Sequence, residues 1–273
     1  MTAEVRDTRL CELGEGPLWH PQRRQLFWFD ILGNRLLSDD GKEWAFGRNA
    51  SAAGWVDDTS LMVATETDLA QLDLESGTLT QIVALEADLP ATRSNDGRAD
   101  PSGGFWIGTM GKDAQHGAGA IYRFYRGELR RLVSPVTIPN AICFPPDGAH
   151  AYYTDTAVGI VWRVPLDSHG WPDGEPQAFL DLGPDAGIDG AVVDRDGRFW
   201  NAQWGHYRVA VYAPDGTLLE VHPLPARQPS CPAFGGPDLS TLFVTTARQG
   251  LGAAATADDG PLYAFGTGAQ GQM

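Results

Sequence analysis

Four acid or amide residues, whose side chains can hold a metal ion or activate water, and one arginine lie in four short segments. Glu15 lies in "LGEGP", Arg93 and Asn95 in "RSNDG", Asn140 in "IPNAI", and Asp189 in "GIDG". Carboxylate and amide oxygens bind hard divalent cations such as Ca²⁺ and Mn²⁺. Each segment also contains Gly or Pro, so a turn is the simpler explanation for any one of them alone. A metal site therefore requires that the four segments meet in space.

A turn followed by a short apolar strand recurs six times along the chain. The aligned strands start at Leu26, Leu61, Phe105, Ala151, Phe199 and Leu242, at intervals of 35, 44, 46, 48 and 43 residues. A second short strand follows each start, and most units contain a further one. About four strands in a repeat of roughly 43 residues is typical of a β-propeller blade. The sequence therefore predicts an all-β, six-bladed β-propeller with four antiparallel strands per blade.

The two ends of the chain are expected to meet in the last blade. The sixth unit is short at its C-terminal end, and "AEVRDTRL" precedes the first unit as a strand without a partner. We expect this N-terminal strand to complete the last blade and close the ring, which removes exposed edges, with residues 1–273 forming a single domain. A Greek-key sandwich is the alternative, but it does not explain six similar units.

The polar residues of the opening paragraph occupy equivalent places in these units. The positions ten or eleven residues before the six strand starts hold Glu15, Ser51, Asn95, Asn140, Asp189 and Cys231. The first strand of a blade faces the propeller axis, so four of these six side chains would bring an acid or amide oxygen to one point. The charges of Glu15 and Asp189 would balance a divalent cation there and leave positions open for water and substrate.

Composition excludes some functions and suggests a compartment. The formal net charge of −15 argues against nucleic acid as a partner, because phosphate binding needs a basic surface. Three widely separated cysteines suggest no disulfide framework. The sequence shows neither the apolar core of a signal peptide nor a run of membrane-spanning length. We expect a cytoplasmic protein with no membrane partner, existing as a monomer or a small homo-oligomer.

The same segments carry a family resemblance. "LGEGPLWHP…LFWFDI", "RSNDGRADPSGGFWIGTM", "PNAICFPPDG…AYYTDT", "GIDGAVVDRDGRFWNAQWG" and "PSCPAFGGPDLSTLFVTTAR" resemble the SMP-30/gluconolactonase/regucalcin family from about Glu12 to Arg248. The resemblance implies one divalent ion on the axis, of calcium, zinc, manganese or iron, and metal-dependent hydrolysis of sugar-acid lactones (aldonolactones) in carbohydrate catabolism. Its implied metal ligands are Glu15, Asn140 and Asp189, and its implied substrate-binding residues are Arg93 and Asn95.

One segment departs from the family pattern. In the regucalcin branch a glutamate in the loop after "GTM" contacts substrate, whereas here that loop is shorter and lacks a glutamate. Asp113, Gln115 and His116 are the possible replacements in the 111–119 loop, and the departure leaves the particular sugar lactone open.

Two further questions stay open at this stage. Asp189 is our choice for the general base that takes a proton from water, with a role as metal ligand only as its alternative. Two other functions compete with the lactonase: a calcium-dependent phosphotriesterase or aryl-ester lactonase, and a non-catalytic calcium-binding propeller.

Overall fold

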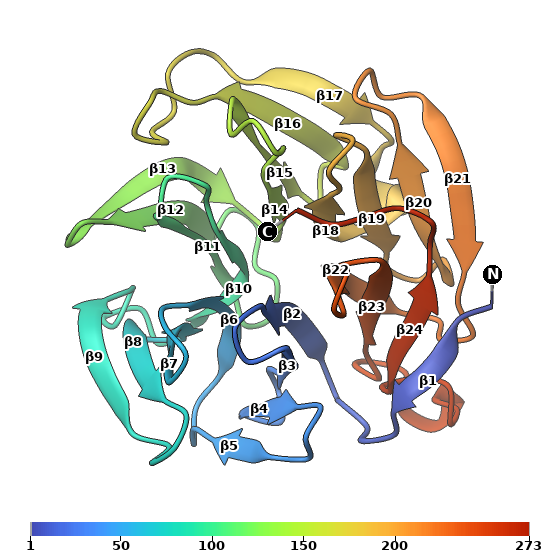
Figure 1. Cartoon of the computed structure of the whole chain (residues 1–273). Helices are drawn as coiled ribbons and strands as arrows, with labels where there is room; N and C mark the ends of the chain where they lie inside the picture. The colour runs from blue at the N-terminus through green and yellow to red at the C-terminus, as the bar shows by residue number, and fades with distance from the viewer. Residues whose placement is uncertain (1, 273) are drawn as a thin grey trace.

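Six four-stranded antiparallel sheets surround a central axis in the computed structural model, which describes residues 2–272 (Figure 1). Blades 1 to 5 follow one another in sequence, as β2–β5, β6–β9, β10–β13, β14–β17 and β18–β21, and blade 6 consists of β22, β23, β24 and β1. This arrangement confirms the predicted six-bladed propeller.

The innermost strand of each blade lies nearest the axis, and the second strand pairs with it. The innermost strands are β2 (Gly14–His20), β6 (Ala50–Trp55), β10 (Thr92–Ala99), β14 (Pro139–Cys143), β18 (Ile188–Val193) and β22 (Pro229–Gly235). The second strands are β3 (Gln25–Asp30), β7 (Ser60–Thr65), β11 (Phe105–Gly111), β15 (His150–Asp155), β19 (Phe199–Gln203) and β23 (Thr241–Thr246). Each second strand contains one of the six starts aligned in the sequence.

Two outer strands complete each blade. The third strands are β4 (Arg35–Ser38), β8 (Asp68–Asp73), β12 (Gly119–Tyr125), β16 (Ile160–Pro165), β20 (Arg208–Tyr212) and β24 (Leu262–Gly266). The outermost strands are β5 (Glu43–Ala45), β9 (Leu79–Ala84), β13 (Glu128–Val136), β17 (Gln177–Asp181), β21 (Leu218–Pro223) and β1 (Glu4–Asp7). The helical segments of the described residues are two 3₁₀ turns, η1 (Pro184–Ala186) and η2 (Gly252–Ala254), and neither is long enough to cross a membrane.

The N-terminal strand closes the ring as predicted. In β1, Glu4 pairs with Ala264 and Val5 pairs with Tyr263 of β24, both antiparallel. Blade 6 is therefore built from both ends of the chain, and the edge of β24 is covered by a strand rather than left open.

The Phe-Trp pairs at the second strands explain how the blades pack. Successive side chains of a strand point to opposite faces of its sheet. In blade 3, Phe105 packs against blade 2 while Trp106 packs against blade 4. In blade 5, Phe199 packs toward blade 4 and Trp200 toward blade 6. Six clusters of buried residues result, each lying between two neighbouring blades.

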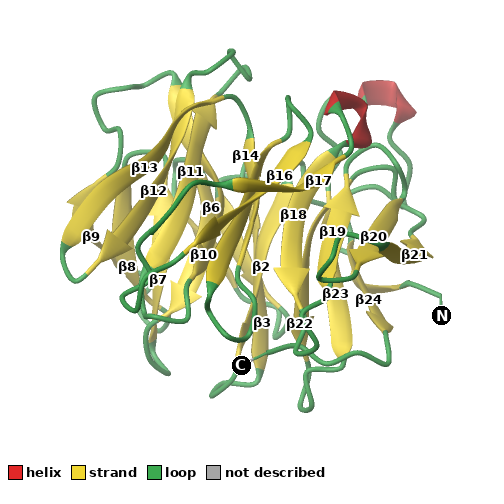
Figure 2. Ribbon diagram, turned by 90° about the horizontal axis from the view of Figure 1, so that it is seen from above, coloured by secondary structure: helices red, strands yellow, loops and turns green. Residues whose placement is uncertain are grey.

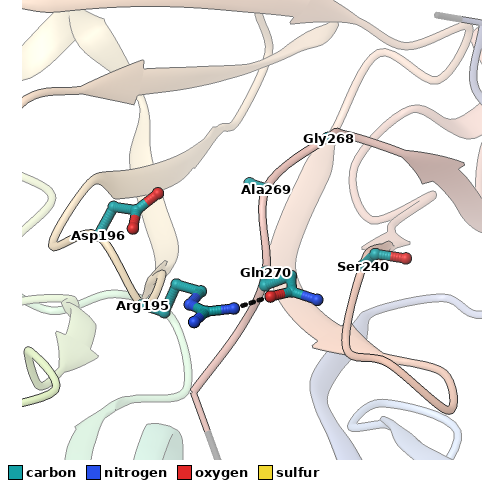
Figure 3. A pocket seen from close by; sticks show the side chains of 6 residues that line it. All are labelled: Arg195, Asp196, Ser240, Gly268, Ala269 and Gln270. Atoms are coloured by element: carbon teal, nitrogen blue, oxygen red, sulfur yellow. Dashed lines mark hydrogen bonds between the residues drawn. The ribbon is translucent and has the colours of Figure 1, made fainter.

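The C-terminal segment after β24 crosses to the axis, on the side away from the starts of the innermost strands. Gln272 donates from Nε2 to the carbonyl of Phe144 at 2.6 Å and to that of Val193 at 3.1 Å, where two innermost strands end. Figure 2 shows this terminus at one end of the propeller and the two 3₁₀ turns at the other. Figure 3 shows a surface pocket beside this segment, where Arg195 donates to the side chain of Gln270.

Candidate functional site

Every innermost strand has a break in register at the level of the predicted site. The breaks fall between Glu15 and Leu18, Ala50 and Ala52, Ser94 and Gly97, Asn140 and Cys143, Ile188 and Ala191, and Pro229 and Pro232. A β-bulge adds a residue to one strand, bends it and re-aims a side chain. The segment "RSNDG" is thus a bulged strand rather than a turn, which explains why turn-forming residues occur inside β10.

Two glycines allow neighbouring innermost strands to approach closely beside the acidic residues. Gly16 has φ +51°, and a Cβ there would lie 2.3 Å from the carbonyl oxygen of Ser51 in blade 2. A Cβ on Gly190 would lie 2.4 Å from Sγ of Cys231 in blade 6. Because no side chain fits at either place, the glycines that follow Glu15 and Asp189 are required for the close packing around the axis.

A chain of hydrogen bonds joins three blades through the predicted polar residues. Arg93 donates from Nη1 to Oδ1 of Asn95 at 2.7 Å, and Asn95 donates from Nδ2 to Oδ1 of Asn140 at 2.9 Å. Asn140 in turn donates from Nδ2 to Thr156 Oγ1 at 2.9 Å, and Thr156 donates to the carbonyl of Ile188 at 2.6 Å. The chain fixes the Asn140 amide with its oxygen on the side of Asn95.

Glu15 and Asp189 form a buried and mutually repelling pair of carboxyl groups. Their residues are only 4% and 6% exposed. Burial, together with the negative charge of Asp96, raises the pKa of Glu15 to about 8. Burial, with the charges of Glu15 and Asp96, also raises the pKa of Asp189 well above its usual value. In the absence of a cation the pair therefore holds protons at a pH where exposed carboxyls have lost them.

Arg93 supplies positive charge beside this pair. Its guanidinium is buried, and burial lowers its pKa to about 10 while the charges of Glu15 and Asp189 oppose that shift. The group stays charged near neutral pH because its pKa remains far above 7. Five donors on one planar group suit the recognition of several oxygens at once.

The donor set fits a hard divalent cation. Two buried carboxylates that repel each other are stabilised by a cation between them, and the Asn140 amide adds a neutral oxygen. Within residues 2–272 no group of three or more His, Cys, Asp and Glu side chains is placed to hold a metal ion, so such a cation would need amide oxygens beside Glu15 and Asp189. Oxygen donors of this kind favour calcium, magnesium or manganese chemistry over soft-metal chemistry.

The three possible replacements for the missing glutamate are occupied elsewhere. Asp113 and Gln115 bond to each other, with Gln115 Nε2 donating to Asp113 Oδ2 at 3.3 Å, and both are exposed. His116 contacts Thr137 Oγ1 through Nδ1 at 3.4 Å. Among the described residues, none of the three is hydrogen-bonded to the axial residues.

Other residues of the site region have structural roles. Cys231 occupies the sixth equivalent position, but burial raises the pKa of its thiol well above the usual value, so the sulfur stays protonated. The Asp155 carboxylate accepts from the backbone N–H groups of Thr137 at 2.7 Å and Ile138 at 3.0 Å, which braces the entry to β14.

The sequence interpretation missed two charged residues of β10. Asp96 is 2% exposed and accepts from the N–H of Ile142 at 2.7 Å, and Arg98 donates to two backbone carbonyls on other blades. Asp96 follows Asn95 directly in "NDGRA", and Arg98 comes two residues after Asp96. Because charged residues on an innermost strand need buried partners, their presence there could have identified them. The segment resembles a turn, and for that reason they were not singled out.

A six-bladed propeller with paired carboxyl and amide groups where its innermost strands meet defines a class of axial-site β-propellers. Within that class the chain belongs to the SMP-30/gluconolactonase/LRE-like family, whose sequence model matches residues 13–248. This match agrees with the resemblance carried by the five segments, and it covers all six innermost strands.

Named relatives place the chain among lactonases, which hydrolyse the ester bond of a lactone. It is 40% identical to the L-arabinolactonase of Azospirillum brasilense over 95% of this chain and 87% of that protein. It is 32% identical to the 6-deoxy-6-sulfogluconolactonase of Pseudomonas putida over 90% of this chain and 87% of that protein.

A solved structure agrees closely with the fold. The calcium-binding protein regucalcin of Agrobacterium tumefaciens superposes with a TM-score of 0.96 at 40% identity, covering 98% of this chain and 95% of that one.

Proposed function

We propose that this protein is a metal-dependent lactonase that hydrolyses aldonolactones to open-chain sugar acids in carbohydrate catabolism. The observation that carries the proposal is the cluster of Glu15 and Asp189, two buried carboxyl groups, beside the buried Arg93 guanidinium. A site of this polarity suits a ligand with many hydroxyl groups, because each buried polar group then finds a partner. The sugar lactones named for two relatives belong to that class.

Glu15, Asn140 and Asp189 would hold the divalent ion. When bound, the ion supplies Lewis-acid chemistry that stabilises negative charge developing on the lactone carbonyl oxygen. Asp189, in its proposed second role, accepts a proton from the water that adds to the carbonyl carbon. The ester C–O bond of the ring then breaks, and the ring oxygen leaves as a hydroxyl group after receiving the proton held by Asp189.

Arg93 and Asn95 would bind and orient the substrate. Arg93 directs fixed donors at substrate hydroxyl or ring oxygens, and its bond to Asn95 Oδ1 holds it in place. Asn95 is itself held between Arg93 and Asn140 by bonds of 2.7 and 2.9 Å, so it presents a preset orientation to the ligand.

The test is lactone hydrolysis by chelator-stripped protein, followed with a pH indicator. Glucono-, galactono-, arabino- and xylono-lactones are assayed with added Ca²⁺, Mn²⁺, Zn²⁺ or Fe²⁺, and the spontaneous rate is subtracted. We expect metal-restored turnover with at least one pair, and none in a Glu15→Gln variant. Turnover of aryl esters or phosphotriesters alone would replace the proposed substrate class. Metal binding without any turnover would indicate a non-catalytic calcium-binding propeller.

A further inference from the structure

The inner edges of β14 and β18 present backbone groups that no neighbouring strand pairs. Each innermost strand pairs within its blade only on the side of the second strand. Buried N–H and C=O groups on the other edge need partners, because leaving one unpaired costs about 1–3 kcal/mol.

Two side chains of β10 form hydrogen bonds with the backbone N–H and C=O groups of Ile142 on this edge. Asp96 accepts from the Ile142 N–H at 2.7 Å, and Arg98 donates from Nε to the Ile142 carbonyl at 3.1 Å. Blade 3 therefore holds blade 4 through side chains that replace the two hydrogen bonds of a missing strand.

Arg98 extends the same contact to two more blades. Its Nη2 donates to the carbonyl of Ala191 on β18 at 3.0 Å and lies 3.9 Å from Cys231 Sγ on β22. One partly buried guanidinium thus contacts blades 4, 5 and 6 from blade 3. The Nε and Nη2 donors lie at fixed, separate places on one planar group, an arrangement that the compact lysine ammonium does not reproduce.

The two carbonyls are close in sequence to proposed metal ligands. Ile142 is two residues after Asn140, and Ala191 is two residues after Asp189. Both pairs lie within the register breaks of their strands, which run from Asn140 to Cys143 in β14 and from Ile188 to Ala191 in β18. The bridge by Arg98 therefore sets the separation of β14 and β18 where their side-chain oxygens must converge.

We propose that Arg98 is a positioning residue for the axial metal site, acting by holding blades 4 and 5 at the spacing that the ligands require. This inference rests on the proposed metal site. A purely electrostatic role would have the opposite sign, because a positive charge near the site weakens cation binding.

The experiment measures Ca²⁺ and Mn²⁺ affinity of the intact chelator-stripped protein by titration calorimetry, well below the melting temperature. Arg98→Lys keeps the charge and loses the bridge, whereas Arg98→Met loses both. We expect both variants to bind each ion at least tenfold more weakly than the wild type. Arg123→Lys is the matched control, because Arg123 is a fully buried arginine bonded to Asp100 at 2.6 Å. The metal affinity of this variant should equal that of the wild type.

The possible outcomes separate the two proposals. Unchanged affinity in Arg98→Lys, or tighter binding in Arg98→Met, would overturn the positioning role while leaving the proposed function intact. If the wild type binds neither ion, the metal site fails and the inference fails with it. Equal weakening in Arg123→Lys would show a general effect of destabilisation and also overturn it. If Arg98→Met does not fold, Arg98→Lys alone decides.

Discussion

Asn95 donates a hydrogen bond of 2.9 Å to the side-chain oxygen of Asn140, although 45 residues separate them in the chain. The bond crosses from blade 3 to blade 4. It joins a proposed substrate-binding residue to a proposed metal ligand, so we expect the two functions to be coupled. A change at either residue should alter both metal affinity and substrate use.

An Asp189→Asn variant can distinguish a general base at this position from a residue that only binds the metal. Asp189→Asn retains an oxygen that can bind a cation but removes the proton acceptor. If Asp189 is the general base, kcat at saturating metal should fall by about 10²- to 10⁴-fold. If it is only a ligand, metal affinity should fall and kcat should recover when enough metal is added. Steady-state kinetics across a metal titration distinguish the two results.

Arg93→Lys should impair substrate binding more than chemistry. The lysine keeps a positive charge but loses the planar set of donors and the bond to Asn95 Oδ1. We expect KM to rise about tenfold with a smaller change in kcat, since the interaction is made in both the ground and transition states. A loss confined to kcat would instead place Arg93 at the reacting atoms.

Removing the acidic pair's repulsion should stabilise the metal-free protein at high pH. The pKa of Glu15 is raised from 4.5 to about 8, so the folded state holds a proton that the unfolded state releases between those values. Stability of the stripped wild type must therefore fall as pH rises through this window. Glu15→Gln removes this pH-dependent loss of the free energy of unfolding, which is on the order of a few kcal/mol. Thermal melts at pH 4 should differ little, and melts at pH 9 should favour the variant.

Metal binding should show the complementary pH dependence. The cation competes with protons for Glu15 and Asp189, so binding releases protons and strengthens as pH rises. Added Ca²⁺ or Mn²⁺ should raise the melting temperature of the wild type more at pH 8 than at pH 5. No such gain is expected in Glu15→Gln, and an equal gain there would place the ion elsewhere.

The C-terminal segment should contribute stability without taking part in the reaction. Gln272→Ala removes the two hydrogen bonds to Phe144 and Val193, at a cost of about 1–2 kcal/mol. A melting temperature lower by a few degrees with unchanged kcat and metal affinity is expected. Gln81→Ala, at an exposed position of β9, is the control and should leave all three quantities as they are. A loss of metal affinity in Gln272→Ala would link this end of the propeller to the site.

Much of the fold could be predicted from the sequence because it is built from local signals. Each repeat carries its own turn and short apolar strand, and β3, β11 and β19 each contain a Phe-Trp pair, so the number of blades follows from counting the repeats. The closing role of β1 followed from one unpaired strand and one incomplete repeat. Equivalent places in the repeats also identified Glu15, Asn95, Asn140 and Asp189 as residues of the innermost strands.

The sequence by itself therefore determined the repeat architecture and which polar residues belong to the innermost strands. Only the tertiary structure decided that "RSNDG" is a bulged strand, that Asn95 bonds to Asn140, and that Arg98 reaches carbonyls on two other blades. These contacts join residues 44 to 93 positions apart. The physical reason is that spacing within a repeat reports which residues are equivalent, whereas hydrogen bonds and pKa shifts depend on how closely separate blades approach at the axis.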